Sequence, residues 1–442
     1  MKNFLIITMP FDIGIGGFRR SYNVLPLLAK RLSEEFEVEV YIPANAIRTA
    51  IKFYLEQLSE NATLIKRDLV EEASQKALND INDLLKRSNY SFTFNEKVFI
   101  EALKINKQVI LHELKNSLMK SVLWSFMECF RPTAVEVFER NFCDRVKKYF
   151  ASYTWDVIYS MHETPDALRT AIYLGDKRSY SIVLLQLDTG SNLPEKLVSI
   201  QLFRELVRKT TLKGILTVSP QPILESPHIL RFINLDNMKI KILFPACAIH
   251  EHIFKYSGSE KNPYTAIYFG RISVEKGMLD LLRAWGYVME KVHDAKLSIV
   301  GRFDKEYDKK RFFKMLRGSK VKNISYLGYV PQDKLFDITS RHSLLIYPSY
   351  RDSFSLVVLE ALAMGLNVIA YDIPALRYLY SCSSLVKLVP KGNYTLLAKV
   401  LVKTLKEPPK KIDSYTKMLL KAHSSWESVV NEEYNKVVAL IH

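Results

Sequence analysis

Two carboxylates bracket an apolar stretch in the second half of the chain. Asp352 and Glu360 flank the run SFSLVVL within the segment RDSFSLVVLEALAMG. If a helix begins near Phe354, Glu360 lies about two turns along it, and the two acids are about 12 Å apart. That separation is too large for the two acids to share a proton. It suits two hydroxyl-bearing parts of one extended ligand, because ionised carboxylates accept strong hydrogen bonds from hydroxyl groups.

Two cations, Arg271 and Lys276, lie in the segment FGRISVEKG, directly after a strand-like run. Fixed cations at the end of a strand can bind a diphosphate. They would stabilise the negative charge that builds on a diphosphate leaving group as its bond breaks. The alternative is that both are ordinary surface side chains.

A glycine-rich segment, DIGIGGF (12–18), follows the first apolar run of the chain. Gly16 and Gly17 have no Cβ, so the main chain there can approach a ligand closely. The N-terminus of a following helix would also offer free N–H groups to an anion. The segment lacks the full spacing of the dinucleotide-binding fingerprint. A simple tight turn therefore explains it equally well.

The elements that must position these residues are predicted by short apolar runs that alternate with helical stretches. The pattern is typical of buried parallel strands. The runs form two series, at 2–10, 38–44, 155–162, 181–188, 214–219 and 239–245, and at 265–272, 295–301, 323–329, 343–349 and 366–372. Two series predict an α/β protein with two doubly wound, Rossmann-like domains. Ligands of such sheets bind outside the carboxyl ends of the strands, so we expect a site in a cleft between two facing domains.

The domain boundary is expected near 245–264, where the strand pattern gives way to polar and turn residues. We predict a first domain over 1–245, a second over 246–423, and a C-terminal helix over 424–442. Residues 46–150 have apolar positions at helical spacing. We expect this region to add helices to the first domain, where they could form a wall of the acceptor site.

Composition narrows the class of protein. The 442 residues are 48% hydrophobic and 25% charged, as in globular proteins. No apolar run reaches the roughly 18 residues of a membrane span, and we expect the N-terminal run to be a first strand rather than a signal peptide. The cysteines form no CxxC pair, which argues against a metal or disulfide framework and fits a reducing cytoplasm. They are Cys129, Cys143, Cys247 and Cys382.

The net charge of +16 lies mostly in the second half of the chain. Residues 261–442 hold 29 Lys and Arg against 17 Asp and Glu, and the basic residues are densest at 302–322. A diphosphate ligand or an anionic membrane surface would explain this. A solvated helix face with its apolar side turned inward would explain it too. Nucleic acid is disfavoured because the run lacks regular aromatic interleaving.

Taken together, GRISVEKG and, about 75 residues later, DSFSLVVLEALAMG resemble the retaining, nucleotide-sugar-dependent glycosyltransferases of family 4, which have the GT-B fold. The resemblance covers nearly the whole chain and is more specific in the C-terminal half. Further segments follow in the family's order: GIGG, VSPQPILES (218–226), KIKILFPACAI (239–249) and the final Trp-containing helix.

The resemblance implies a role for each matching residue. Arg271 and Lys276 would neutralise the diphosphate of the donor, for example a UDP- or GDP-sugar. Asp352 would hold the donor sugar, and Glu360 the ribose. Gly16 and Gly17 would approach the diphosphate or the acceptor. Main-chain contacts with the donor would come from Ser353, Phe354, Ser355, Leu356 and Val357. The fold needs no metal site of the Asp-x-Asp type, and the chain contains no Asp-x-Asp.

The sequence departs from the family pattern at several positions. The family has Glu where Asp352 stands, and usually a Gly where Ser355 stands. The family's active-site His has no counterpart, and Asp188 in LLQLDTG (184–190) lies there instead. Asp188 could orient a hydroxyl or stabilise an oxocarbenium-like centre. His162 matches a position that is often His in relatives and is expected to face the acceptor, with plain packing as the alternative.

The implied function is transfer of a hexose, with retention, to a hydroxyl of a glycan, glycolipid or lipid-linked oligosaccharide. We expect a cytoplasmic protein, with peripheral membrane association allowed and no nucleic-acid partner. Two alternatives remain open. One is a catalytically degenerate GT-B binding protein, suggested by Asp188 and Ser355, and the other is a GT-B epimerase or phosphorylase.

Overall fold

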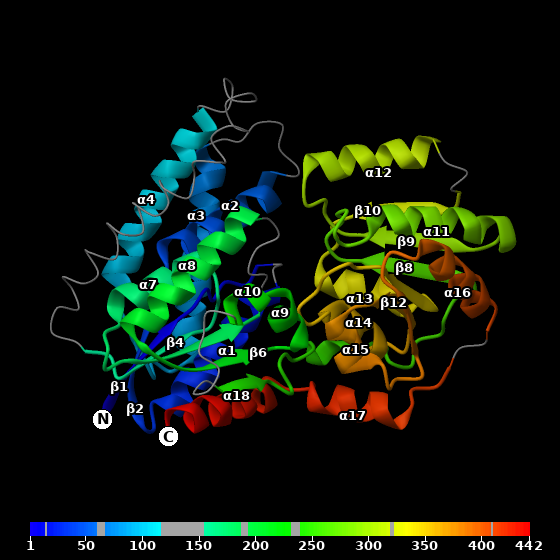
Figure 1. The fold of residues 1–442 in the computed structure, drawn as a ribbon. Coiled ribbons are helices and arrows are strands. Elements are labelled where there is room, and N and C mark those ends of the chain that lie inside the picture. The colour runs from blue at the N-terminus through cyan, green and yellow to red at the C-terminus, as the bar shows by residue number, and fades with distance from the viewer. Residues whose placement is uncertain are drawn as a thin grey trace. The chain divides into compact units, whose positions relative to one another are not determined.

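The chain divides into two compact units, each built on its own parallel sheet (Figure 1). The structure is a computed structural model, and it describes residues 1–13, 16–59, 67–115, 154–186, 193–230, 239–318, 322–407 and 410–442. The first unit contains Met1–Val218, Glu225–Leu243 and Val429–His442, and the second contains Ser219–Leu224 and Phe244–Ser428. The predicted pair of doubly wound α/β domains is therefore confirmed as a fold class. Ser219–Leu224, which the sequence analysis assigns to the first domain, groups with the second unit.

The first unit holds a seven-stranded parallel sheet in the order β3-β2-β1-β4-β5-β6-β7. In the register of its centre, Phe4 lies opposite Val38 on one side and Val157 on the other. The strands are β1 (Lys2–Ile7), β2 (Phe36–Tyr41), β3 (Thr93–Phe94), β4 (Val157–Ser160), β5 (Tyr180–Leu185), β6 (Thr211–Thr217) and β7 (Lys239–Ile242). The first strand is buried over its last four residues, as expected for a central strand.

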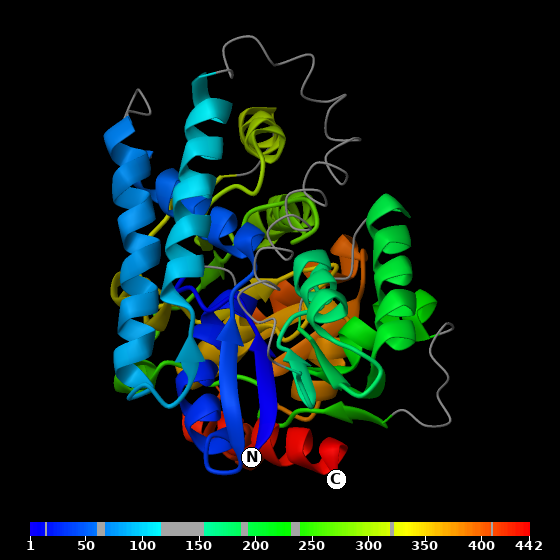
Figure 2. The ribbon, with the colours of Figure 1, turned by 90° about the vertical axis from the view of Figure 1, so that its left-hand side faces the viewer.

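Long helices dominate the rest of the first unit. Figure 2 shows α3 and α4 side by side, and the expected helical elaboration is confirmed as far as residue 115. Residues 116–153 of the predicted elaboration lie outside the described residues. The helices are α1 (Gly16–Leu32), α2 (Ala44–Ser59), α3 (Arg67–Arg87), α4 (Glu96–Lys115), α7 (Pro165–Leu174), α8 (Leu193–Lys209), α10 (Pro227–Leu230) and α18 (Trp426–Ile441).

The second unit holds a six-stranded parallel sheet in the order β10-β9-β8-β11-β12-β13. Its strands are β8 (Thr265–Phe269), β9 (Lys296–Val300), β10 (Ile324–Gly328), β11 (Leu344–Tyr347), β12 (Asn367–Asp372) and β13 (Val386–Pro390). Alternate residues enter cores on opposite faces. Ile267 and Phe269 belong to one core, and Ala266 and Tyr268 to the other. Strands β3 and β13 were not predicted. One is two residues long, and the other ends in a proline, so neither carries a clear strand pattern.

The helices of the second unit cover both faces of this sheet. They are α9 (Pro220–Glu225), the 3-10 helix η3 (Glu251–Tyr256), α11 (Met278–Lys291), α12 (Glu306–Gly318), α13 (Gln332–Ser340), α14 (Leu356–Ala363), α15 (Pro374–Tyr380), α16 (Tyr394–Lys406) and α17 (Ser414–Ala422). Helix α12 carries the basic run, and its Phe312, Met315 and Leu316 pack against a core. The solvated-helix interpretation of that run is thus confirmed for its apolar side. No helix within the described ranges is long and apolar enough to cross a bilayer.

Candidate active site

The cationic segment forms a tight loop between β8 and α11. Gly277 has φ 78°, a conformation that glycine adopts most easily. A Cβ added there would lie 1.9 Å from the carbonyl oxygen of Pro348. The Tyr350 main-chain N–H also donates to the Glu275 carbonyl at 3.0 Å. Glycine at 277 thus lets the loop after β8 pack directly on the loop after β11, because the two strands are neighbours.

This packing brings Lys276 and Asp352 into contact. The Lys276 Nζ donates to Asp352 Oδ2 at 2.7 Å and to the Arg351 carbonyl at 3.0 Å. The Tyr347 hydroxyl also donates to Asp352 Oδ2. The other carboxylate oxygen accepts from the main-chain N–H groups of Phe354, at 3.2 Å, and Ser355, at 2.9 Å. Asp352 therefore joins two loops and fixes the main chain that leads into α14.

Asp352 is ionised in this setting. Burial alone would raise the pKa of its carboxyl group, but the charge of Lys276 and the hydrogen bonds that Asp352 accepts outweigh burial and lower the pKa to about 2. Both of its oxygens already accept from protein donors. A donor sugar bound by Asp352 would have to share it with these groups.

Arg271 lies at the same edge of the sheet and is the more accessible of the two cations. Its Nη1 lies 3.1 Å from both carboxylate oxygens of Asp304, and its side chain is 55% exposed. Burial opposes its charge, but Asp304, Asp352 and Glu275 outweigh that effect and raise the pKa of the guanidinium. A permanently charged, half-exposed guanidinium suits capture of an anionic ligand.

Helix α14 begins at the residue where the sequence departs from the family's usual glycine. Ser355 caps the helix with φ 63°, in the left-handed region. Glycine populates this region freely, whereas other residues rarely do. The backbone here therefore explains the family's usual glycine. Leu356 and Val357 form the first turn, and Glu360 is buried within the helix, 6% exposed.

The loop between β11 and α14 is supported by residues that the sequence analysis did not identify. They are two tyrosines and the segment Ser219–Leu224 of the second unit. The Tyr380 hydroxyl donates to the carbonyls of Phe354, at 3.3 Å, and Ser355, at 3.2 Å. Tyr347, described above, is the last residue of β11. The Ser219 hydroxyl donates to the Ser353 carbonyl, which ties Ser219–Leu224 to the second unit. A tyrosine at the carboxyl end of a buried strand was the available signal for Tyr347, and nothing in the sequence pointed to Tyr380.

The first unit places its predicted residues differently. Gly16 and Gly17 open α1. His162 is completely buried, its Nε2 lies 2.8 Å from the Ser21 hydroxyl, and its Nδ1 lies 3.1 Å from the Gln186 amide nitrogen. Burial, with a smaller contribution from the charge of Arg20, lowers its pKa to about 3, so the ring is neutral. Contact with an acceptor would require this network to open. Asp188 lies outside the described residues.

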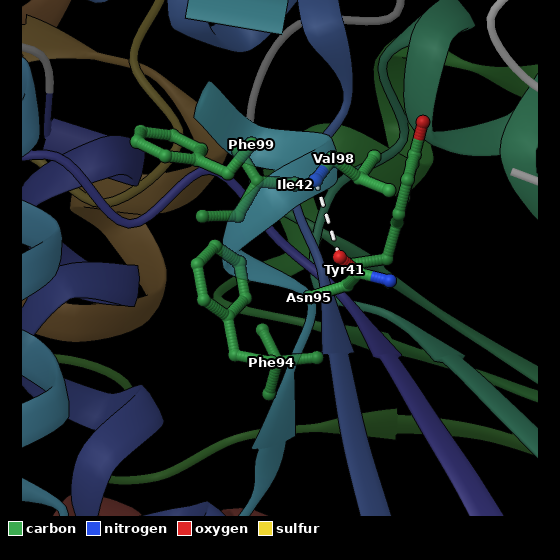
Figure 3. A pocket seen from close by; sticks show the side chains of 7 residues that line it. Tyr41, Ile42, Phe94, Asn95, Val98 and Phe99 are labelled. Atoms are coloured by element: carbon green, nitrogen blue, oxygen red, sulfur yellow. Dashed lines mark hydrogen bonds between the residues drawn. The ribbon is translucent and has the colours of Figure 1, made fainter. Parts of the chain in front are cut away.

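Two of the hollows among the described residues differ in size and in lining. One, at the edge of the first sheet, is lined by apolar and aromatic side chains together with Asn95 (Figure 3) and has room for about one water molecule, 10 Å³. A larger one, about 250 Å³, lies beside the loop after β8 and is lined by Glu275, Asp280, Arg283 and Tyr350. No group of three or more His, Cys, Asp or Glu residues in the described ranges could hold a metal ion.

Part of the second unit matches a known protein family. Residues 250–418 match the family model "Glycosyl transferases group 1". The chain is 34% identical to a phosphatidyl-myo-inositol mannosyltransferase of Mycobacterium leprae over 146 residues. These residues are 32% of this chain and 37% of that protein. The matched segment thus spans little more than a third of that relative's length.

Solved structures resemble this chain more in fold than in sequence. HepE of Anabaena, solved in complex with UDP and glucose, has a TM-score of 0.58 at 12% identity and covers 99% of this chain and 100% of its own. Sucrose-phosphate synthase of Thermosynechococcus elongatus has a TM-score of 0.52 at 17% identity and covers 67% of this chain and 77% of its own. The likeness in fold therefore extends over both units. Residues 250–418 thus match the group 1 glycosyl transferases, and the fold of both units is that of solved GT-B glycosyltransferase structures.

Proposed function

We propose that this protein transfers a hexose from a nucleotide diphosphate donor to a hydroxyl group, with retention of configuration. The second unit binds the donor. Arg271 and Lys276 neutralise the diphosphate, Asp352 and the main chain of Ser353–Val357 hold the sugar, and Glu360 holds the ribose. The first unit binds the acceptor, a glycan, glycolipid or lipid-linked oligosaccharide.

The observation that carries the proposal is the arrangement of charge where two neighbouring parallel strands end. Arg271 and Lys276 follow β8, and Asp352 follows β11. Lys276 is 2.7 Å from Asp352, and Arg271 is close enough to Asp352 for that acid to raise its pKa. Positive charge next to a hydroxyl-binding acid suits a ligand that joins a diphosphate to a sugar, because charge on the departing diphosphate is stabilised where the sugar is held.

The relatives support the substrate class. The Mycobacterium leprae protein is named a phosphatidyl-myo-inositol mannosyltransferase, and HepE was solved with UDP and glucose. Both names fit a nucleotide hexose as donor, and the first fits an acceptor on a lipid. A thermal-shift panel of UDP- and GDP-hexoses would identify the donor, since a ligand at 100 times its Kd adds about 2.7 kcal/mol to the stability of the unit that binds it.

The decisive experiment replaces Arg271 with alanine and measures donor consumption. We expect turnover to fall by about a hundred- to a thousandfold, because one stabiliser of the leaving group is lost. Its Asp304 pair is half-exposed, so the free energy of unfolding should change by less than about 1 kcal/mol. Arg341→Ala is the matched control, since Arg341 also pairs with an aspartate, Asp337, on the surface of the same unit. Equal turnover in both variants would refute the assignment.

A non-catalytic nucleotide-sugar binding protein is the second candidate, and Ser355 favours it. This residue holds a left-handed conformation where the family usually has glycine. Ser355→Gly would relieve the main chain at the start of α14. If the wild-type protein binds a nucleotide sugar without consuming it, with or without acceptors, the binding function is correct and transfer is not.

A further inference from the structure

The main chain of Asp12, in the glycine segment ahead of Gly16 and Gly17, is held by two of the added helices. Asp12 lies between the end of β1 and the start of α1. Its main-chain N–H donates to Asp80 Oδ2 of α3 at 3.2 Å. The Tyr54 hydroxyl of α2 lies 3.3 Å from the Asp12 carbonyl oxygen and also hydrogen-bonds to Asp80 Oδ2. Side chains of two helices thus bind both main-chain polar groups of one loop residue.

Packing on either side makes this attachment specific. Phe11 and Ile13 are buried, 0% and 1% exposed, whereas the Asp12 side chain points to solvent. The flanking side chains anchor the loop to the core, and the polar contacts set the orientation of the peptide groups between them. The helices therefore act on the main chain of Asp12 and not on its carboxylate.

Helix α3 also holds the other side of the glycine pair. The Tyr22 hydroxyl of α1 donates to Asp83 at 2.6 Å, and the Arg87 guanidinium lies over the Tyr22 ring, 4.9 Å from its centre. Asp80 and Asp83 are three residues apart and so share a face of α3. One helix face contacts the chain before Gly16 and after Gly17.

The position of Asp80 is costly for stability. Burial raises its pKa to about 6. The charges of Asp12 and Asp83 add to this, while the hydrogen bonds from Tyr54 and the Asp12 N–H oppose it. Near neutral pH an acid with a raised pKa lowers the stability of the fold. A carboxylate kept at such a position is better explained by the main chain that it holds than by stability.

We propose that Asp80 and Tyr54 are positioning residues, and that the α2–α3 helices fix the main chain of Asp12, which precedes Gly16 and Gly17 in the glycine segment, in the orientation that substrate transfer requires. The effect of this orientation on substrate transfer rests on the proposed function. The helical addition to the first unit would then act on the reaction through the glycine segment.

The first experiment measures the loop without any substrate. Hydrogen exchange of the Asp12 amide, read by mass spectrometry with fragmentation to single residues, should be about five- to tenfold faster in Asp80→Ala than in the wild type, because its acceptor is gone. Asp80→Asn keeps an acceptor oxygen and should restore slow exchange. Glu71→Gln is the control on the same helix, since Glu71 pairs with Lys107 of α4 and does not touch the loop.

The second experiment measures turnover in the same variants and in Tyr54→Phe, which removes one hydroxyl without opening a cavity. We expect kcat to fall about 10- to 100-fold in Asp80→Ala and to fall in Tyr54→Phe as well, with the donor KM within about twofold, because orientation rather than binding is lost. Tyr90→Phe, at a tyrosine that is 70% exposed, should leave both constants unchanged.

The outcomes separate this inference from the proposed function. Fast exchange together with lowered kcat supports it. Exchange of the Asp12 amide at the wild-type rate in Asp80→Ala overturns it. Fast exchange in Asp80→Ala with an unchanged kcat also overturns it, when Arg271→Ala is inactive in the same assay. If no nucleotide sugar is consumed even by the wild type, the proposed function fails and the positioning role fails with it, while the exchange data still decide whether the two helices hold the loop.

Discussion

Each unit joins a tyrosine of a central strand to an acid and a cation, but from different elements and with different results. In the first sheet β4 lies next to β1, and in the second β11 lies next to β8. Tyr159 of β4 donates to Glu433 at 2.7 Å, and Glu433 pairs with Arg20 of α1, the helix that comes after β1. Tyr347 of β11 donates to Asp352, and Asp352 pairs with Lys276, which follows β8.

The two ion pairs differ in exposure and in the source of the acid. The side chains of Arg20 and Glu433 are 3% and 0% exposed, whereas those of Lys276 and Asp352 are 13% and 19% exposed. Glu433 comes from the C-terminal helix, 413 residues away from Arg20, while Asp352 comes from the loop next to Lys276. A fully buried pair cannot exchange partners with a ligand. A pair on two loops near solvent can, so we expect the second pair to respond to ligands and the first to stabilise the unit.

The largest effect should come from breaking the buried pair. Glu433→Ala removes the acid that pairs with the buried Arg20 guanidinium, which costs about 3–5 kcal/mol of stability. Urea unfolding followed by pulsed hydrogen exchange would report each unit through its own amides. Glu432→Ala is the control, because Glu432 pairs with Lys436 on the surface of the same helix and should matter by less than about 0.5 kcal/mol. Similar losses in both variants would contradict the proposed contrast.

A smaller effect is expected from the loop pair. Lys276→Met leaves Asp352 partly buried beside a neutral side chain and should cost about 2–3 kcal/mol, less than the first variant because water reaches this site. Adding Asp352→Asn should recover most of that loss, since an asparagine oxygen still accepts from the Phe354 and Ser355 amides. Chemical denaturation of the single and double variants measures the coupling. A double variant as unstable as Lys276→Met would show that the loop does not depend on this charge pair.

The smallest effect is the response of the same loop to acid. The pKa of Asp352 is lowered from 3.8 to about 2, so its ionised form stabilises the fold above pH 4 and that stability is lost as the pH falls toward 2. The full contribution is about 2 kcal/mol, and about half of it disappears between pH 5 and pH 3. The measurement is the difference in unfolding free energy between wild type and Asp352→Asn at these two pH values. A difference that does not depend on pH would mean that Lys276 does not hold the charge of Asp352.

Most of the fold and part of the site followed from sequence patterns. Buried parallel strands need apolar residues on both faces, so their short runs could be placed to within a few residues. Arg271 lies at the carboxyl end of a predicted strand and Lys276 and Asp352 follow predicted strands, and parallel topology brings such positions to one edge of a sheet. Lys276 and Asp352 lie in contact at that edge. Helix α1 begins inside the glycine segment 12–18, at Gly16, and not after it as predicted, because the glycines that open it resemble a loop.

Only the tertiary structure decided which polar groups meet. Arg20 and Glu433, or Asp12 and Asp80, lie far apart in sequence and on elements whose periodicity shows only which face is buried. A buried donor must find an acceptor, but the pattern of apolar residues does not say from which element it comes. The sequence therefore determined two parallel sheets and a cationic edge beside an acid. The packing of loops and helices determined that Asp352 is held by Lys276 and Tyr347, that His162 is buried, and that α3 holds the main chain of Asp12.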